Sequence, residues 1–201
     1  LSHLAYVHVK NIGTATVPDY PIVTERGDKT VRMIRWILDA PPAPLYSRFG
    51  GFTKNIDRWQ YAEAMVPSYN TVRVGCMPAG SGASAGDHPD QFAIKSGGRN
   101  GQGFEFYNLN AITPESETST WYFYAHARNF SQDDHQMDEE FRQELRGAFQ
   151  EDVDILAAQQ MNMERHTHNP KAWVDITVDG PGLTLRRMLA EEIAAEAATW
   201  S

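Results

Sequence analysis

The chain has 201 residues, of which 41% are hydrophobic and 22% are charged. This balance is typical of an ordinary globular domain and excludes a disordered or fibrous protein. Its 18 Lys and Arg residues against 26 Asp and Glu residues give a net charge of −8, and the chain has no basic run. We therefore expect neither nucleic acid nor a membrane surface as a partner. The single cysteine, Cys76, excludes an intrachain disulfide bond.

The chain contains neither an apolar run of about 18 residues nor the pattern of a secretory signal. These features predict a cytoplasmic protein. The sequence opens on Leu1 rather than Met, which we interpret as a sign that it is a piece of a longer polypeptide.

Six segments are rich in β-branched and aromatic residues, and several alternate with a period of two. They predict strands of a largely antiparallel sheet at residues 30–38, 58–66, 70–77, 91–95, 103–113 and 118–128. The Gly- and Ser-rich stretch 78–87 predicts a loop that acts either as a connector or as a lid.

The hydrophobic period changes to 3.6 residues from about Met137, which predicts a long helix to about Met163. A second helix is predicted from about Leu185 to Trp200. Strands followed by long helices indicate a single α+β domain, residues 1–201, with the helices laid across one face of the sheet.

One carboxylate lies on the apolar side of the long predicted helix. At about 100° per residue, Asp152 falls about 20° from Phe141, whereas Asp154 falls about 140° away on the solvent side. A carboxylate in an apolar stripe needs a partner, because burying an unpaired charge is costly. A salt bridge to an Arg of the sheet, a metal ion and a catalytic role all remain open for Asp152. The predicted buried stripe consists of Phe141, Leu145, Ala148, Leu156 and Met163.

Two histidines lie at the start of the chain, five residues apart. Regular helix would rotate His3 and His8 about 140° from each other, so a shared metal ion requires the helix to end or kink between them. Gly13 follows shortly afterwards and suits a helix stop.

Four separated pieces together resemble the C-terminal catalytic domain of Rieske-type non-haem iron oxygenases, in the branch that contains vanillate and dicamba O-demethylases. The opening Leu1-Ser2-His3-Leu4-Ala5-Tyr6-Val7-His8 resembles the ligand motif of that family, and Glu151-Asp152 matches the position of its carboxylate ligand. A third piece, Thr113-Pro114-Glu115-Ser116-Glu117-Thr118-Ser119 followed by Trp121-Tyr122-Phe123 and Arg128-Asn129-Phe130, resembles the sheet signature of the branch. The fourth piece, Ile155-Leu156-Ala157-Ala158-Gln159-Gln160, continues the segment of the carboxylate ligand.

The resemblance implies a helix-grip fold, in which an antiparallel sheet wraps around a long C-terminal helix. It also implies that His3, His8 and Asp152 hold a mononuclear Fe(II) ion, and two imidazoles with one carboxylate suit that ion and leave positions open for dioxygen. Family members carry an N-terminal Rieske domain whose [2Fe–2S] cluster needs two Cys and two His. Because this chain has one Cys, we expect that domain to be absent from it.

The resemblance further implies a small aromatic substrate that binds beside the iron. Asn110 falls at a position of polar substrate contact in the family, although an amide turned to solvent is an equal alternative. His126 is a candidate for binding a substrate carboxylate, with a hydrogen-bonded structural histidine as its alternative. Aromatic residues of the predicted strands line either a pocket or the core: Phe104, Phe106, Tyr107, Trp121, Tyr122, Phe123 and Tyr124.

The implied function is that of a terminal oxygenase component, which activates O2 at the iron to hydroxylate or O-demethylate a vanillate-like aromatic compound. Electrons would come from NAD(P)H through a reductase or ferredoxin and the Rieske centre, and the family assembles as homotrimers. Three alternatives stay open. They are an aromatic ring-hydroxylating dioxygenase of the same superfamily, a zinc hydrolase that uses the same three ligands, and a helix-grip module that only binds ligands.

Overall fold

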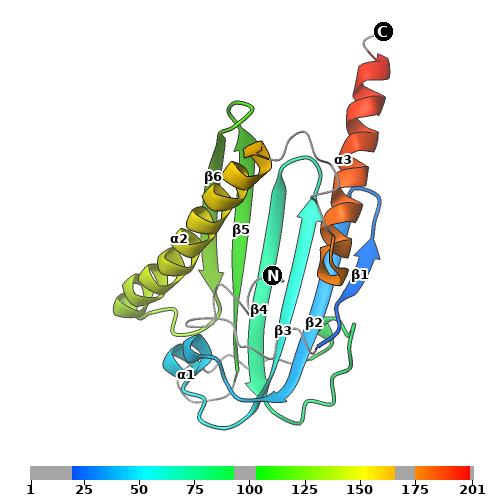
Figure 1. Ribbon diagram of the computed structural model, residues 1–201. Helices are drawn as coiled ribbons and strands as arrows, with labels where there is room; N and C mark the ends of the chain where they lie inside the picture. The colour runs from blue at the N-terminus through cyan, green and yellow to red at the C-terminus, as the bar shows by residue number, and fades with distance from the viewer. Residues whose placement is uncertain (1–19, 93–102, 166–174, 200–201) are drawn as a thin grey trace.

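The computed structural model describes residues 20–92, 103–165 and 175–199. Six strands form one antiparallel sheet, in which each strand pairs with the next one along the chain (Figure 1). The strands are β1 Val23–Arg26, β2 Thr30–Ala40, β3 Ile56–Met65, β4 Tyr69–Pro78, β5 Phe104–Pro114 and β6 Thr120–Arg128. The α-helices are α1 Pro44–Gly50, α2 His135–Arg165 and α3 Gly180–Thr199, and two short 3-10 helices are η3 Pro89–Gln91 and η6 Thr177–Asp179.

All three α-helices lie on the same side of the sheet (Figure 1). We call this side the inner face and the opposite side the outer face. Helix α2 crosses β5 and β6, whereas α3 runs beside β1 and β2 and contacts both strands. The central strands, β3 and β4, therefore lie between the two long helices.

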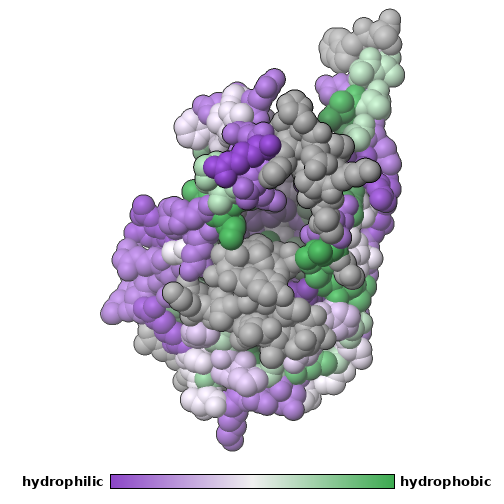
Figure 2. Space-filling model, viewed as in Figure 1, coloured by the Kyte–Doolittle hydropathy of each residue, from purple (hydrophilic) through white to green (hydrophobic). Residues whose placement is uncertain are grey.

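The first half of α2 packs on an aromatic core. Asp134 starts the helix, since its carboxylate accepts a hydrogen bond from the backbone N–H of Met137 at 3.0 Å. Phe141 lies edge-on to the rings of Phe49 and Phe106, with centroids 5.2 and 5.0 Å apart. The opposite side of the helix carries hydrophilic residues (Figure 2), so the amphipathic pattern is what seats the helix on the sheet.

The outer face has a core of its own around β2 and β3. Trp36 and Trp59 lie 5.4 Å apart there, and Trp36 donates a hydrogen bond from its indole to the backbone oxygen of Asp87 at 2.7 Å. Trp59 occupies the space above Gly75, where a Cβ atom would lie 2.2 Å from the Trp59 ring. Ala83 is buried in the same cluster. The stretch predicted as a connector or a lid thus covers the outer face, away from the helices.

The α+β prediction is confirmed, with six strands and two long helices. The predicted strand at 91–95 is wrong where the structure describes it, because Gln91 ends a 3-10 helix; residues 93–95 lie outside the described ranges. The short strand β1 and the short helix α1 were not predicted, since β1 is mostly exposed and α1 begins in a proline-rich stretch.

The predicted buried stripe of α2 is correct only in the first half of the helix. Phe141, Leu145 and Ala148 are buried as predicted, whereas Leu156 is 58% exposed and Met163 is half-buried. A helix of 31 residues is about 46 Å long, and a strand of ten residues is about 33 Å long, so the helix outruns the sheet that it crosses. Its later turns have less of the sheet to pack against.

Candidate functional site

The predicted iron ligands are described only in part. His3 and His8 lie outside the described residues, so their geometry with Asp152 is not tested. Within the described ranges, no cluster of three His, Cys, Asp or Glu side chains is placed to hold a metal ion. The described part of the candidate site consists of side chains of α2 and of the inner face.

Asp152 lies on the part of α2 that faces β6. Burial raises the pKa of Tyr122 to about 12, and the negative charge of Asp152 and neighbouring Tyr124 add to that increase. Asp152 is half-buried, whereas Asp154 is exposed and accepts a hydrogen bond from Gln150 at 3.0 Å. The predicted difference between these two carboxylates is confirmed: Asp152 faces the sheet and Asp154 faces solvent.

Asn110 lies at the centre of a hydrogen-bonded network on the inner face. Its side-chain oxygen accepts hydrogen bonds from the Tyr122 hydroxyl at 2.7 Å and from the Asn108 amide at 2.9 Å. Its own amide donates to the side-chain oxygen of Asn70 at 2.6 Å. Because Asn110 is only 3% exposed, the alternative of an amide turned to solvent is wrong.

The network still offers hydrogen-bonding groups to a bound molecule. Among the described residues, the buried side-chain oxygen of Asn108 has no partner. An asparagine amide has two N–H bonds, and the network described here uses one of those of Asn110. Buried polar groups are costly to leave without partners, so this region is suited to a polar ligand.

His126 lies on β6 directly opposite Asn108. Its ring packs against Phe149 of α2 and Tyr124 of β6, with centroids 5.7 and 5.3 Å away. Within the described part of the chain, neither ring nitrogen has a hydrogen-bond partner, although both are buried. Burial lowers the pKa of His126, which favours the neutral ring with one N–H donor and one acceptor. The alternative of a hydrogen-bonded structural histidine finds no partner among these residues.

The inner face of β2 and β3 carries polar residues that the sequence analysis did not identify. Arg35 pairs with Gln60 across the two strands, and both are buried. Arg58 is also fully buried and lies over the ring of Tyr46 at 5.3 Å. Alternation along the strand could have identified Arg35, because it places Arg35 on the same face as the buried apolar residues Val31, Met33 and Ile37.

The aromatic residues of β5 and β6 divide between the two faces. Phe104 and Phe106 belong to the core beneath α1 and α2. Tyr122 and Tyr124 lie on the inner face against Phe149. The remaining predicted pocket residues alternate onto the outer face and are exposed: Tyr107, Trp121 and Phe123. Only the inner-face set is positioned to line a site beneath α2.

Comparisons with known proteins show the family and the fold of the chain. Residues 1–195 match the family model of the vanillate O-demethylase oxygenase C-terminal domain. The chain is 30% identical over 201 residues to a vanillate O-demethylase oxygenase subunit of Pseudomonas sp., covering 98% of this chain and 53% of the relative. It is 29% identical over 195 residues to a toluene-4-sulfonate monooxygenase system iron-sulfur subunit of Comamonas testosteroni, covering 96% and 52%.

A solved structure shares the fold. Dicamba monooxygenase bound to 3,6 dichlorosalicylic acid superimposes with a TM-score of 0.80 at 22% identity, covering 98% of this chain and 53% of that one. The chain thus spans about half the length of the proteins it matches. The α+β architecture predicted from the sequence is the architecture of this neighbour.

Proposed function

Because the chain belongs to the vanillate O-demethylase oxygenase C-terminal domain family, we propose that it is the mononuclear-iron catalytic domain of a Rieske-type oxygenase. The observation that carries the proposal is the position of Asp152. Helix α2 holds this carboxylate toward β6, beside the Tyr122 hydroxyl that donates to Asn110. The carboxylate that we propose as a metal ligand and the polar groups that we propose as substrate contacts thus lie between one helix and one sheet face.

His3, His8 and Asp152 are the proposed iron ligands. Two neutral imidazoles and one carboxylate form the donor set that binds Fe(II) on one face and leaves the other positions open. The half-buried Asp152 fits this role, because a bound cation stabilises a carboxylate that is partly removed from water. Asp154 faces solvent, and water stabilises its charge. When bound, the ferrous ion would supply dioxygen activation for oxidation of a carbon of the substrate.

The inner face would bind and orient a small aromatic substrate. Tyr124 and Phe149, whose rings stack at 4.7 Å, supply an apolar surface for an aromatic ring. Asn110 and His126 supply hydrogen-bonding groups next to it. Asn110 and both ring nitrogens of His126 are buried, which strengthens the polar contacts that these groups make.

The electron supply belongs to the parts of the system outside the described site. Relatives are named as an oxygenase subunit and as an iron-sulfur subunit of a monooxygenase system. We extend this to the present chain and propose NAD(P)H as the electron source, a reductase or ferredoxin as the carrier, a [2Fe–2S] Rieske cluster as the donor and a homotrimer as the assembly. The relatives' names, vanillate and toluene-4-sulfonate, support a small aromatic substrate for this chain.

The first test is the iron content of two matched aspartate variants. Asp152→Asn is expected to bind ferrous iron at least about tenfold more weakly than the wild type, because an amide is a poorer ligand than a carboxylate. Asp154→Asn serves as the control on the same helix and is expected to bind iron like the wild type. Anaerobic titration with Fe(II), followed by iron analysis and circular dichroism, measures both binding and folding.

Two results would contradict the proposal. One is iron binding that is unchanged by Asp152→Asn, His3→Ala and His8→Ala. The other is a tightly bound zinc ion in a chain that consumes no O2 after chemical reduction, which would favour a hydrolase. Product analysis with a methoxybenzoate separates demethylation from ring hydroxylation.

A further inference from the structure

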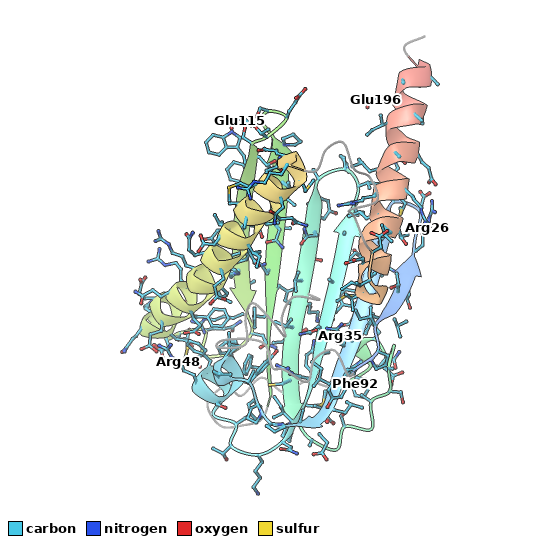
Figure 3. All side chains as sticks on the ribbon, in the orientation of Figure 1. Arg26, Arg35, Arg48, Phe92, Glu115 and Glu196 are labelled. Carbon is cyan, nitrogen blue, oxygen red and sulfur yellow. The ribbon has the colours of Figure 1, made fainter. Side chains whose placement is uncertain are left out.

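Arg35 lies in the middle of β2 and points to the inner face, between α2 and α3 (Figure 3). It is 1% exposed. Its hydrogen bond to Gln60 is weak, because Nη1 donates to the side-chain oxygen of Gln60 at 3.4 Å. Its Nε atom is buried and has no partner among the described residues.

Another buried arginine of this sheet, in contrast, has carboxylate partners. Arg73, on the outer face of β4, is also buried, and it pairs with the carboxylates of Glu105 and Asp90. None of the described carboxylates pairs with Arg35, and the guanidinium of Arg58 is close enough to repel its charge. Burial and that positive charge both lower the pKa of Arg35. A buried cation without a neighbouring anion destabilises a folded chain, as does a buried ion pair from which one partner has been removed.

Arg35 and the asparagine network occupy the same face of the sheet. The register pairs Arg35 with Gln60, Gln60 with Val74 and Val74 with Phe106, so these four side chains share one row. Asn108 lies two residues along β5 from that row and on the same face. Three strand spacings separate β2 from β5, about 14 Å. A long guanidinium side chain and one substituted benzene ring together span that distance.

We propose that Arg35, supported by Gln60, binds the acidic group of the substrate, which makes the substrate an aromatic acid with a carboxylate or sulfonate. The planar fork of a guanidinium donates two parallel hydrogen bonds to such a group. The ring would then extend across Ala62 and Val72, small or branched apolar residues between β2 and β5 on the inner face, toward Asn110. This inference rests on the proposed function for the identity of the ligand as a substrate.

The test compares acids with a neutral analogue of the same shape. The probes are 4-methoxybenzoate, toluene-4-sulfonate and 4-methoxybenzamide, measured by calorimetry and by the shift in melting temperature. The wild type is expected to bind the acids at least tenfold more tightly than the amide, as a charged hydrogen-bonded pair in a buried site requires. Arg35→Met is expected to lose that preference while its affinity for the amide stays within about twofold.

A second readout separates binding from a structural role. Because Arg35→Met removes a buried charge that no described carboxylate neutralises and retains much of the side-chain volume, the ligand-free variant is expected to melt at a higher temperature than the wild type. A structural arginine would give the opposite shift. Arg48→Met is the matched control: Arg48 is an exposed α1 residue that donates to Glu144 at 2.7 Å, and its loss should leave the preference for acids unchanged.

If Arg35→Met does not fold, Arg35→Lys replaces it. Lysine keeps the charge without the fork, so the preference for acids should fall by less than about tenfold, and part of it should remain. Unchanged acid binding in Arg35→Met or Arg35→Lys would overturn the inference. Protection of the wild type by sulfate alone, with no effect of either aromatic acid, would assign Arg35 to an inorganic anion and would also overturn it.

These outcomes are independent of the iron. Asp152→Asn is expected to lose iron and turnover yet keep the preference for acids, since Arg35 lies on β2. A chain that lacks turnover but still prefers acids would contradict the proposed function alone. A chain that oxidises substrate equally well with Arg35→Met would contradict this inference alone.

Discussion

At the scale of single residues, one buried carboxylate joins three segments of the sheet. Asp57, at the start of β3, accepts hydrogen bonds from the backbone N–H groups of Asp39, Gly80 and Ser81 at 2.8, 3.0 and 2.8 Å. It also accepts one from the Ser81 hydroxyl at 2.6 Å. Burial alone would raise the pKa of Asp57, but these hydrogen bonds outweigh it and lower the pKa below its usual value.

The lowered pKa predicts how the stability contributed by Asp57 depends on pH. A carboxylate that is more acidic in the folded chain stabilises it fully above the unfolded pKa of about 3.9, and the stabilisation is lost as the pH falls through the folded pKa. Asp57→Asn is therefore expected to lower the free energy of unfolding at pH 7 by about 1–3 kcal/mol. The difference from the wild type should shrink below about pH 4.

Urea unfolding between pH 3 and pH 7 measures that difference. Glu117→Gln, an exposed position in the turn between β5 and β6, is the control and should change the free energy of unfolding by less than about 0.5 kcal/mol. A loss in Asp57→Asn that is the same at every pH would mean that the carboxylate charge is not what stabilises this junction.

At the scale of elements, α2 has two halves with different roles. Its first half ends in the aromatic core, where Phe141 is surrounded by Phe49, Phe106 and Phe130. Its middle carries Phe149 and Asp152 against β6. The later turns expose apolar side chains: Val153, Ile155, Leu156 and Met161. The helix is thus anchored by its N-terminal half, which positions Asp152 further along.

This division predicts unequal effects of truncating two apolar residues of one helix. Phe141→Ala is expected to lower the free energy of unfolding by about 3–5 kcal/mol, because it leaves a cavity among three rings. Leu156→Ala is the control and should change it by less than about 0.5 kcal/mol. Both are measured by urea unfolding monitored by circular dichroism. Equal losses would show that the second half of α2 is buried in solution.

At the scale of the whole molecule, the sheet is held from both edges and its polar surface lies between. Helix α3 is attached to the β1–β2 edge through Met188, which is buried with Val31 and Val66. Ion pairs at the surface reinforce the contact, Arg26 with Glu191 at 2.7 Å and Lys29 with Glu192 at 2.9 Å. No helix within the described ranges is long and apolar enough to cross a membrane.

The attachment of α3 through one buried side chain predicts local unfolding. Met188→Ala is expected to cost about 2–5 kcal/mol of packing free energy at this contact and to speed hydrogen exchange in α3 and β1, while α2 stays protected. Ile193→Ala, at an exposed position of α3, should leave exchange unchanged. Equal loss of protection in α2 and α3 would mean that the two helices unfold as one unit.

The sequence alone determined the elements whose pattern is local. Five of the six strands and both long helices follow from periods of 2 and 3.6 residues, and the same geometry correctly separated Asp152 from Asp154. It missed β1, whose side chains are mostly exposed, because a strand without a buried face has no alternation to detect. Leu156 was placed in the buried stripe because periodicity carries no information about where the underlying sheet ends.

Only the tertiary structure decided which side of the sheet became the site. Alternation places Arg35, Asn110 and His126 on a face of their own strands, but whether that face meets a helix or solvent depends on residues far away in the chain. The partners of Asn110 come from β4, β5 and β6, and only the positions of the described carboxylates show that none of them pairs with Arg35. Local pattern sets the direction of a side chain, whereas long-range packing sets its environment and therefore its chemistry.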